Sequence, residues 1–239
     1  GLPLAIELAA SRLRVLSASE VASRLGERLD LLRDGRRVGH PHHQTLRAVM
    51  DWSHDLLSAG EAVLFRRLSV FRAPWTLEDA EAACGGEPLA EGTVADLVGA
   101  LVDKSLVTLA ARLPEPRWRM LETVAQYAAE RLHASGETSV VRDRHLADLA
   151  AHVEAAVEEF TGPRQAEFLD RLEREHADLA SALAWACEGG DIVTGMRMGA
   201  QLLHFWLDRG HWHEGRDVLA RLTTSTGAER CELERAKAL

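Results

Sequence analysis

Two short β-like runs interrupt a sequence whose composition otherwise favours helices. The runs are SLVTLAA and RWRML, and the proline-rich segment RLPEP joins them. Apolar and β-branched residues in short runs favour strands, and proline favours the turn between them. The sequence therefore predicts one small β-hairpin, at residues 105–121, inside a mainly α-helical protein.

After a helix in TLRAVMDWSHDLL, three further helices are expected ahead of this hairpin. Ser58 is followed three residues later by Glu61, which is the signature of a capping box at a helix start. Thr76 can cap a second helix, and a third helix is expected to begin at Thr93. Helices followed by a short hairpin is the winged-helix order. We therefore assign residues 44–138 to a winged-helix-like domain.

The region 139–239 has a helical pattern that is broken at TGP, GGD, RGH and STG. Shifting this region by about twenty residues along itself aligns Gly190 with Gly210 and Gly195 with Gly215. The pattern predicts a tetratricopeptide-like array of helical hairpins, in which Gly190 and Gly210 end helices in the left-handed conformation. Gly215 stands where such repeats usually carry alanine.

Residues 1–43 are expected to form a helical subdomain. Pro3 suits the first turn of an amphipathic helix, and the buried face of that helix needs a cover. We therefore expect the chain to be part of a longer protein. A loop carries His40, His42 and His43, but no cysteine or carboxylate lies beside them, so we interpret these residues as solvated rather than as zinc ligands.

The composition excludes several classes of protein. No run of eighteen apolar residues predicts a membrane span, and three cysteines without a CxxC pair are typical of reduced thiols in the cytoplasm. The formal net charge of -9 argues against a generally basic surface for nucleic acid. We expect a cytoplasmic globular protein without contact with a membrane.

Four segments together resemble one family. GLPLAIELAA, HQTLRAVMDWSHDLLSAGEAVLFRRLSVF, LVDKSLV and RWRMLETVAQYAAERL are similar, in this order, to the C-terminal half of STAND-class signal-transduction ATPases, above all the large bacterial ATP-dependent transcriptional regulators. The resemblance implies that Gly1, Leu2 and Pro3 lie against the adenine of ATP or ADP, bound with Mg²⁺, in the intact protein. It also implies an upstream nucleotide-binding domain as a partner of this chain.

The family's Met-His-Asp phosphate sensor corresponds to Met120, Leu121 and Glu122 in this sequence. Leu121 cannot donate a hydrogen bond, so sensing of a phosphate would need another residue, such as Arg119 or His43. The sequence also lacks the G-x-x-x-x-G-K-[ST] motif that holds nucleotide phosphates. We expect no catalytic residue and no cofactor in this chain, which is therefore not an enzyme by itself.

The third helix of a winged-helix domain usually enters the major groove of DNA. Here that helix would present Thr93, Asp96, Asp103 and Lys104 to solvent, and two acids beside one lysine repel phosphate. We expect no direct DNA binding by this helix. The basic residues elsewhere in these regions are assigned either to a contact with the absent ATPase domain or to no contact; they are Arg36, Arg37, Arg66, Arg67 and Arg72.

The most promising partner site in the helical array contains Trp206, His211 and Trp212, which lie near a turn. Trp185 is expected in the core, and no metal site is expected. Two functions remain open. In the first, the chain is the switch and sensor section of a regulatory ATPase, with a protein or small-molecule effector at the helical repeats. In the second, it is a DNA-binding winged-helix transcription factor with a helical tail for dimerisation or ligand sensing.

Overall fold

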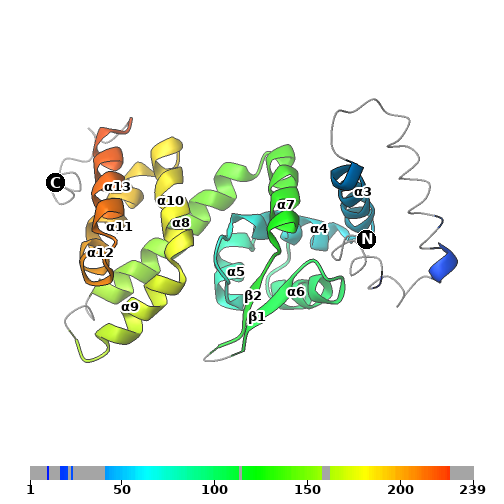
Figure 1. Ribbon diagram of the computed structural model, residues 1–239, viewed down its shortest axis with the longest axis horizontal. Helices are drawn as coiled ribbons and strands as arrows, with labels where there is room; N and C mark the ends of the chain where they lie inside the picture. The colour runs from blue at the N-terminus through cyan, green and yellow to red at the C-terminus, as the bar shows by residue number, and fades with distance from the viewer. Residues whose placement is uncertain are drawn as a thin grey trace. The chain divides into compact units, whose positions relative to one another are not determined.

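The computed structural model describes residues 41–112, 115–157 and 162–226, together with Ala10, Ser17–Glu20 and Ser23. This part of the chain is mainly helical and contains one two-stranded antiparallel sheet (Figure 1), so the predicted fold class is confirmed. Gly1, Leu2 and Pro3 lie outside the described residues. No helix within the described ranges is long and apolar enough to cross a membrane.

The chain divides into two compact units. The first unit contains residues 1–69 and 85–131, and the second contains residues 70–84 and 132–239. The division into three parts at residues 43 and 138 stays a prediction.

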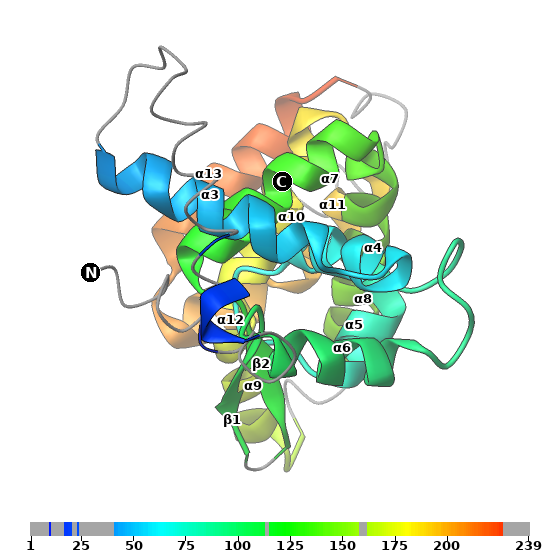
Figure 2. The same cartoon turned by 90° about the vertical axis from the view of Figure 1, so that its right-hand side faces the viewer.

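Within residues 41–69 and 85–131, the first unit holds three complete helices, the hairpin and most of a fourth helix. Its elements are α3 (Pro41–Asp55), α4 (Ala59–Arg67), α6 (Val94–Asp103), β1 (Thr108–Ala111), β2 (Arg117–Arg119) and α7 (Glu122–Ser135), the last of which continues into the second unit. The predicted capping box is confirmed, because the Ser58 side chain accepts from the Glu61 N–H and Glu61 accepts from the Ser58 N–H. The two strands pair Thr108 with Arg119, and Figures 1 and 2 both place this hairpin beside α6.

A buried arginine holds the loop that precedes α6. The guanidinium of Arg67 donates to the backbone carbonyls of Gly85, Gly86 and Glu87 at 3.0, 2.9 and 2.7 Å. Arg67 is only 3% exposed, and charged groups are buried at this level when hydrogen bonds satisfy them. The expectation that Arg67 faces an absent domain or no partner is therefore wrong.

The second unit is built around the long helix α8. Its elements are the 3-10 turn Leu68–Val70 at its boundary, α5 (Leu77–Cys84), α8 (Thr138–Val157), α9 (Gln165–Arg174), α10 (His176–Glu188), α11 (Ile192–Gln201), α12 (Leu203–Arg209) and α13 (Trp212–Thr224). Helix α8 contacts α5, α10 and α11. One apolar cluster runs through α8 to α13 and includes Leu183, Leu202 and Phe205, each at most 2% exposed.

The aligned glycines lie at close contacts between helices. A Cβ on Gly195 would come within 2.4 Å of Ala186 Cβ, and a Cβ on Gly215 would come within 2.4 Å of the Trp206 indole. The bulk of Trp206 thus explains why glycine replaces alanine at position 215. At the helix ends Gly210 is left-handed, with φ 81°, as predicted.

The other predicted left-handed residue is wrong by one position. Helix α10 ends at Glu188, and the next residue, Gly189, has φ 136°, while Gly190 has no positive φ. The N–H of Gly190 instead donates to the Trp185 carbonyl at 3.0 Å. Trp185 is half-buried, and its indole N–H donates to Asp143 at 2.8 Å, so its position in the core is only partial.

Candidate functional site

An apolar pocket of about 300 Å³ lies between α12 and α13. Two of the three residues predicted to bind a partner, Trp206 and Trp212, are in its wall. The complete lining is Leu203, Trp206, Leu207, Trp212, Gly215, Arg216, Leu219, Ala220 and Thr223. The structure therefore brings the two tryptophans together, although six positions separate them in the sequence.

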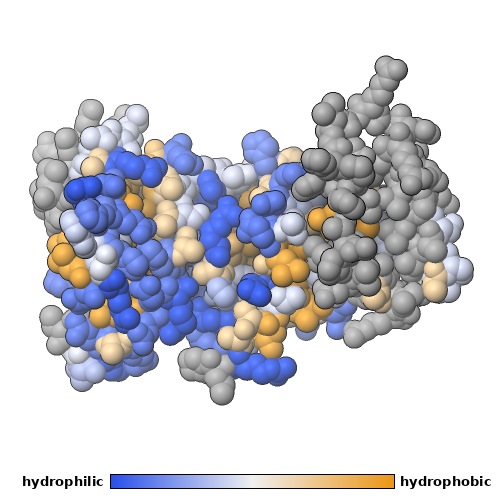
Figure 3. All heavy atoms as spheres, in the orientation of Figure 1, coloured by the Kyte–Doolittle hydropathy of each residue, from blue (hydrophilic) through white to orange (hydrophobic). Residues whose placement is uncertain are grey.

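The pocket has a buried floor and an apolar rim. Trp206 is 3% exposed, whereas Leu203, Leu207 and Trp212 are 45%, 61% and 53% exposed. These three are among only seven large hydrophobic residues that are exposed in the described part of the chain. In Figure 3 apolar atoms reach the surface at the left-hand edge, where α12 lies in Figure 1. Exposed apolar residues that gather in one place indicate a binding surface.

Local sequence explains how the pocket forms. Gly210 adopts the left-handed conformation that ends α12, and α13 begins two residues later at Trp212. Because Gly215 has no Cβ, the first turns of α13 approach the face of Trp206 closely. The stretch WLDRGHWHEG thus sets the depth of the pocket as well as its turn.

The polar groups of the pocket are few and already bonded. Arg216 pairs with its neighbour Asp217 at 2.8 Å, and the Thr223 hydroxyl donates to the Leu219 carbonyl at 2.9 Å. The lining contains no acid and no histidine that could act as a general acid or base. Its chemistry is suited to binding an apolar group.

His211, the third predicted partner residue, does not line this pocket. Its Nε2 atom lies 3.1 Å from Oε2 of Glu173 in α9, and its ring stacks on that of His176 with centroids 4.2 Å apart. The structure therefore separates His211 from the tryptophans and joins it to a second group of side chains. Sequence spacing could not show this group, because His211 lies 38 residues from Glu173.

Helix α6 has a surface unlike that of a DNA-reading helix. Val94, Val98 and Leu101 face the core, and the exposed positions are Ala95, Asp96, Gly99 and Asp103. Lys104, which was expected to face solvent, forms an ion pair with Glu61. Burial acts to raise the pKa of Glu61, but hydrogen bonds from Lys104 and Ser58 outweigh it and lower that pKa. No cation on this face of α6 is left to contact phosphate.

The hairpin beside α6 carries the exposed cations of this unit's wing. Arg112 and Arg119 are both exposed, whereas Arg117 is buried and pairs with Glu115 at 2.6 Å. The positive charge that a phosphate could meet is thus in the hairpin rather than in the helix.

The phosphate-sensor position lies where α7 begins. Leu121 is half-buried, and its carbonyl accepts from the Ala125 N–H at 2.9 Å. Glu122 is exposed and accepts from the Gln126 side chain at 2.9 Å. A carboxylate there would repel a phosphate group, and the sensor role of both residues stays a prediction.

Comparison with known domains identifies the part of the chain around the hairpin. Residues 57–133 match the family described as "Winged helix-turn-helix domain". This range lies within the predicted 44–138, so the prediction of a winged-helix domain in this part of the chain is confirmed. No solved structure matches the chain.

Longer proteins from mycobacteria are similar to most of the chain. A protein of Mycobacterium bovis and one of Mycobacterium tuberculosis, each named "Putative HTH-type transcriptional regulator", are 39% identical to 90% of this chain, which covers 24% of their length. An uncharacterized protein of Mycobacterium tuberculosis is 38% identical over 61% of the chain and 37% of its own length. The chain thus spans about a quarter of the regulators it matches, and within it residues 57–133 are a winged helix-turn-helix domain.

Proposed function

We propose that this chain is the effector-binding section of a winged-helix transcriptional regulator. The names of the similar mycobacterial proteins and the winged helix-turn-helix domain support this function. They favour the second of the two functions left open by the sequence over the nucleotide switch. The observation that carries effector binding is the open apolar pocket between α12 and α13.

The proposed effector is an apolar helix of a protein partner. Leu203, Leu207 and Trp212 form an exposed rim, and such a rim suits the apolar face of a helix better than a small polar metabolite. Trp206 and Trp212 would be the anchors, because tryptophans in pockets dominate the energetics of many protein interfaces. The role is therefore regulatory rather than enzymatic.

Complementation of a gene deletion tests this function. Transcript levels are measured in a strain without the intact regulator and in strains that carry the wild type, Leu207→Glu or Val193→Glu. Val193 in α11 is 43% exposed and does not line the pocket, so it provides the matched control. We expect Leu207→Glu to reproduce the deletion profile and Val193→Glu to restore the wild-type profile, at equal protein levels. If Leu207→Glu restored the wild-type transcript profile in full, the pocket would have no role in regulation.

Contact with DNA is a second candidate function, and the exposed arginines of the hairpin favour it. A wing can reach DNA beside the groove that the third helix occupies, and arginines neutralise phosphates there. Arg112 and Arg119 would make this contact, with α6 contributing no cation. Such binding would be weak and insensitive to sequence.

Fluorescence anisotropy with duplex DNA at low salt tests the DNA contact. We expect Arg112→Glu/Arg119→Glu to reduce the affinity at least about tenfold and to flatten its salt dependence. Arg197→Glu, which changes an exposed arginine of α11, is the control and should leave the affinity unchanged. Absence of binding by the wild type would favour a winged-helix domain that contacts protein instead.

The nucleotide switch remains a proposal about the intact protein. ATP or ADP with Mg²⁺ and the upstream nucleotide-binding domain would act through Gly1, Leu2 and Pro3, which the structure does not describe. The present chain should show no rise of its melting temperature with ATP or ADP, because a ligand stabilises only a state that it binds. A reproducible rise would show a nucleotide site within these residues.

A further inference from the structure

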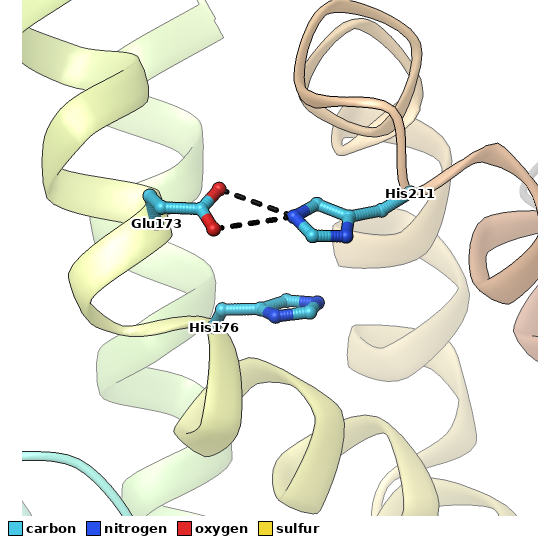
Figure 4. A group of neighbouring side chains, drawn as sticks. All are labelled: Glu173, His176 and His211. Carbon is cyan, nitrogen blue, oxygen red and sulfur yellow. Dashed lines mark hydrogen bonds and ion pairs between the residues drawn. The ribbon is translucent and has the colours of Figure 1, made fainter.

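Four metal-ligating side chains meet at the second group that contains His211. Glu173 lies in the last turn of α9, His176 is the first residue of α10, His211 immediately precedes α13, and Glu214 lies in the first turn of α13. Figure 4 shows the Glu173 carboxylate directed at the His211 ring, with the His176 ring beneath it. Two short segments that are distant in the sequence, residues 173–176 and 211–214, thus bring two imidazoles and two carboxylates together.

The distances are short on both sides of the group. Glu173 approaches His211 Nε2 at 3.1 and 3.3 Å through its two carboxylate oxygens. On the other side Oε2 of Glu214 lies 3.0 Å from Nε2 of His176. One ligand atom from each of Glu173, His176 and His211 can be chosen so that all three lie within 4.8 Å of one another.

We infer that Glu173, His176, His211 and Glu214 form a binding site for a divalent transition metal of the zinc class. Imidazole nitrogen with carboxylate oxygen is a common zinc ligand set, with metal–ligand distances of roughly 2.0–2.2 Å. Tetrahedral ligands at that radius are roughly 3.4 Å apart. The observed spacing therefore needs only side-chain rotation to close around an ion.

One feature of His176 favours this role over a simple ion pair. Its Nε2 atom is buried and makes no hydrogen bond, although the Glu214 oxygen is only 3.0 Å away. A buried ring nitrogen without a hydrogen bond is costly, and a metal ion would satisfy it. Because the two rings stack at an interplanar angle of 24°, one of them must turn to direct its in-plane lone pair at the same ion.

The surroundings hold the ligands in place. Phe205, which is fully buried, lies against both rings, with centroids 5.8 Å from His176 and 5.6 Å from His211. An ion pair between Arg209 and Asp170 joins the end of α12 to α9 next to the site. Phe205 thus gives the two rings an apolar wall, and an apolar shell of this kind limits the access of solvent to a metal site.

A second cluster of ligand types in the described residues shares the buried ring nitrogen without a hydrogen bond, at His152 Nδ1, but differs in its other properties. Asp79, Asp148 and His152 also lie within 4.8 Å of one another. They include a single imidazole, whose Nδ1 atom is 3.6 Å from Glu175. Burial acts to lower the pKa of His152, but Glu175 and Asp148 outweigh it and raise that pKa, which favours the protonated ring that binds no metal. This cluster is explained by ion pairing.

Zinc binding tests the site directly. Because His40, His42 and His43 could bind zinc by themselves, the measurements use a parent chain with His40→Ala, His42→Ala and His43→Ala. Isothermal titration of this chelator-treated parent with Zn²⁺ should show one bound ion per chain. The variant His176→Ala/His211→Ala should lose at least about a hundredfold in affinity, since even removal of outer-shell partners costs ten- to a hundredfold.

Controls separate a site from a local loss of structure. His213→Ala changes an exposed histidine two residues from His211 and should bind zinc like the parent. Glu214→Gln keeps the shape of its side chain and should lower the affinity, with an unchanged circular dichroism spectrum. Co²⁺ bound to the parent should give a four-coordinate visible spectrum that is absent from the double variant. Zinc binding by the double variant within a few-fold of the parent, or no saturable binding by the parent, would overturn the inference.

Discussion

Glu61 in the first unit and Asp178 in the second are buried carboxyl groups whose pKa values shift in opposite directions. In the first unit Glu61 is bonded to Lys104, which holds the carboxylate in its charged form and lowers its pKa. In the second unit burial lowers the pKa of His145 to about 3 and raises the pKa of Asp178 to about 7. Glu61 is thus held in its charged form by a cation, whereas burial shifts His145 and Asp178 toward their neutral forms; Glu175 of the second unit, which pairs with Arg171 at 3.1 Å, behaves like Glu61.

The opposite pKa shifts follow from the different contacts of these side chains. Asp178, in the first turn of α10, accepts from the backbone N–H groups of Arg72 and Ala73 at 2.5 and 3.2 Å. His145 in α8 packs edge-on against Phe71, with ring centroids 5.0 Å apart. These side chains attach residues 71–73 to α8 and α10. Buried polar groups therefore help to hold this loop against the helices of the second unit. The ion pair between Lys104 and Glu61 in the first unit is partly exposed on the lysine side, and it supplements the apolar packing of that unit.

The largest predicted effect tests whether the units are independent. Leu202→Ala removes a fully buried side chain from the second unit and should destabilise it by about 2–5 kcal/mol. Leu101→Ala makes the equivalent change in the first unit. Hydrogen exchange should speed up in α8–α13 for Leu202→Ala and in α4 and α6 for Leu101→Ala. Equal acceleration of both units by either variant would show one cooperative structure.

Sequence patterns predicted the local parts of this comparison well. The capping box at Ser58, the Thr76 cap and the left-handed Gly210 all depend on residues within a few positions of one another, and all are confirmed. The Thr76 hydroxyl accepts from the Asp79 N–H at 3.2 Å, as a helix cap does. The pairing of Trp206 and Trp212 in one pocket followed from their common turn.

Interactions between distant segments were not predictable in this way. Arg67 bonds to a loop that lies 18–20 positions later in the sequence. Asp178 accepts from Ala73 and Arg72, which precede it by 105 and 106 positions. The group around His211 was missed for the same reason, because its side chains come from two separate segments, residues 173–176 and 211–214. A single sequence carries no periodic signal for such contacts, which arise only when helices pack.

The pH dependence of Asp178→Asn would sharpen the contrast between the units. The folded-state pKa of Asp178 is raised from 3.8 to about 7, so its contribution to stability is complete below pH 3.8 and is lost as the pH rises through 7. His145 acts in the opposite sense, with stability present above pH 6.5 and lost as the pH falls toward 3. His145 Nε2 lies 3.7 Å from Oδ1 of Asp178, so in the wild type the two groups titrate as a pair and their contributions oppose each other.

Removing the acid leaves the histidine unopposed. Urea unfolding of Asp178→Asn between pH 7 and 4 should show a steeper loss of stability on acidification than the wild type, by a few kcal/mol over this range. The asparagine accepts weaker hydrogen bonds from the N–H groups of Arg72 and Ala73. That loss of stability is the same at every pH, so it does not change the slope of stability against pH. Parallel curves for the two proteins would mean that Asp178 is charged in the folded state throughout.

A smaller effect is expected at the floor of the pocket. Gly215→Ala places a Cβ within 2.4 Å of the Trp206 indole, so the ring or α13 must shift, at a cost of about 1–3 kcal/mol. Gly99→Ala in α6 is the control, because no atom lies within 4 Å of its added Cβ and alanine favours helix. Thermal melts should show a loss for Gly215→Ala and no loss for Gly99→Ala. Equal melting temperatures for Gly215→Ala and Gly99→Ala would show that the Trp206 indole can move aside without a loss of stability.

The smallest predicted effect concerns the charge pair of the first unit. Lys104→Met keeps the length of the side chain but leaves Glu61, whose side chain is 8% exposed, with only its bond from Ser58. Because the lysine is itself 24% exposed, we expect a loss of about 1 kcal/mol at neutral pH. A double-mutant cycle with Glu61→Gln isolates the coupling energy between the two side chains, and a value of zero would show that the ion pair does not stabilise the fold.

The lowered pKa of Glu61 gives stability above pH 4.5 that is lost as the pH falls, opposite in sense to Asp178. Lys104→Met should weaken this pH dependence. Affinity for duplex DNA should not change, because Lys104 is already bonded to Glu61.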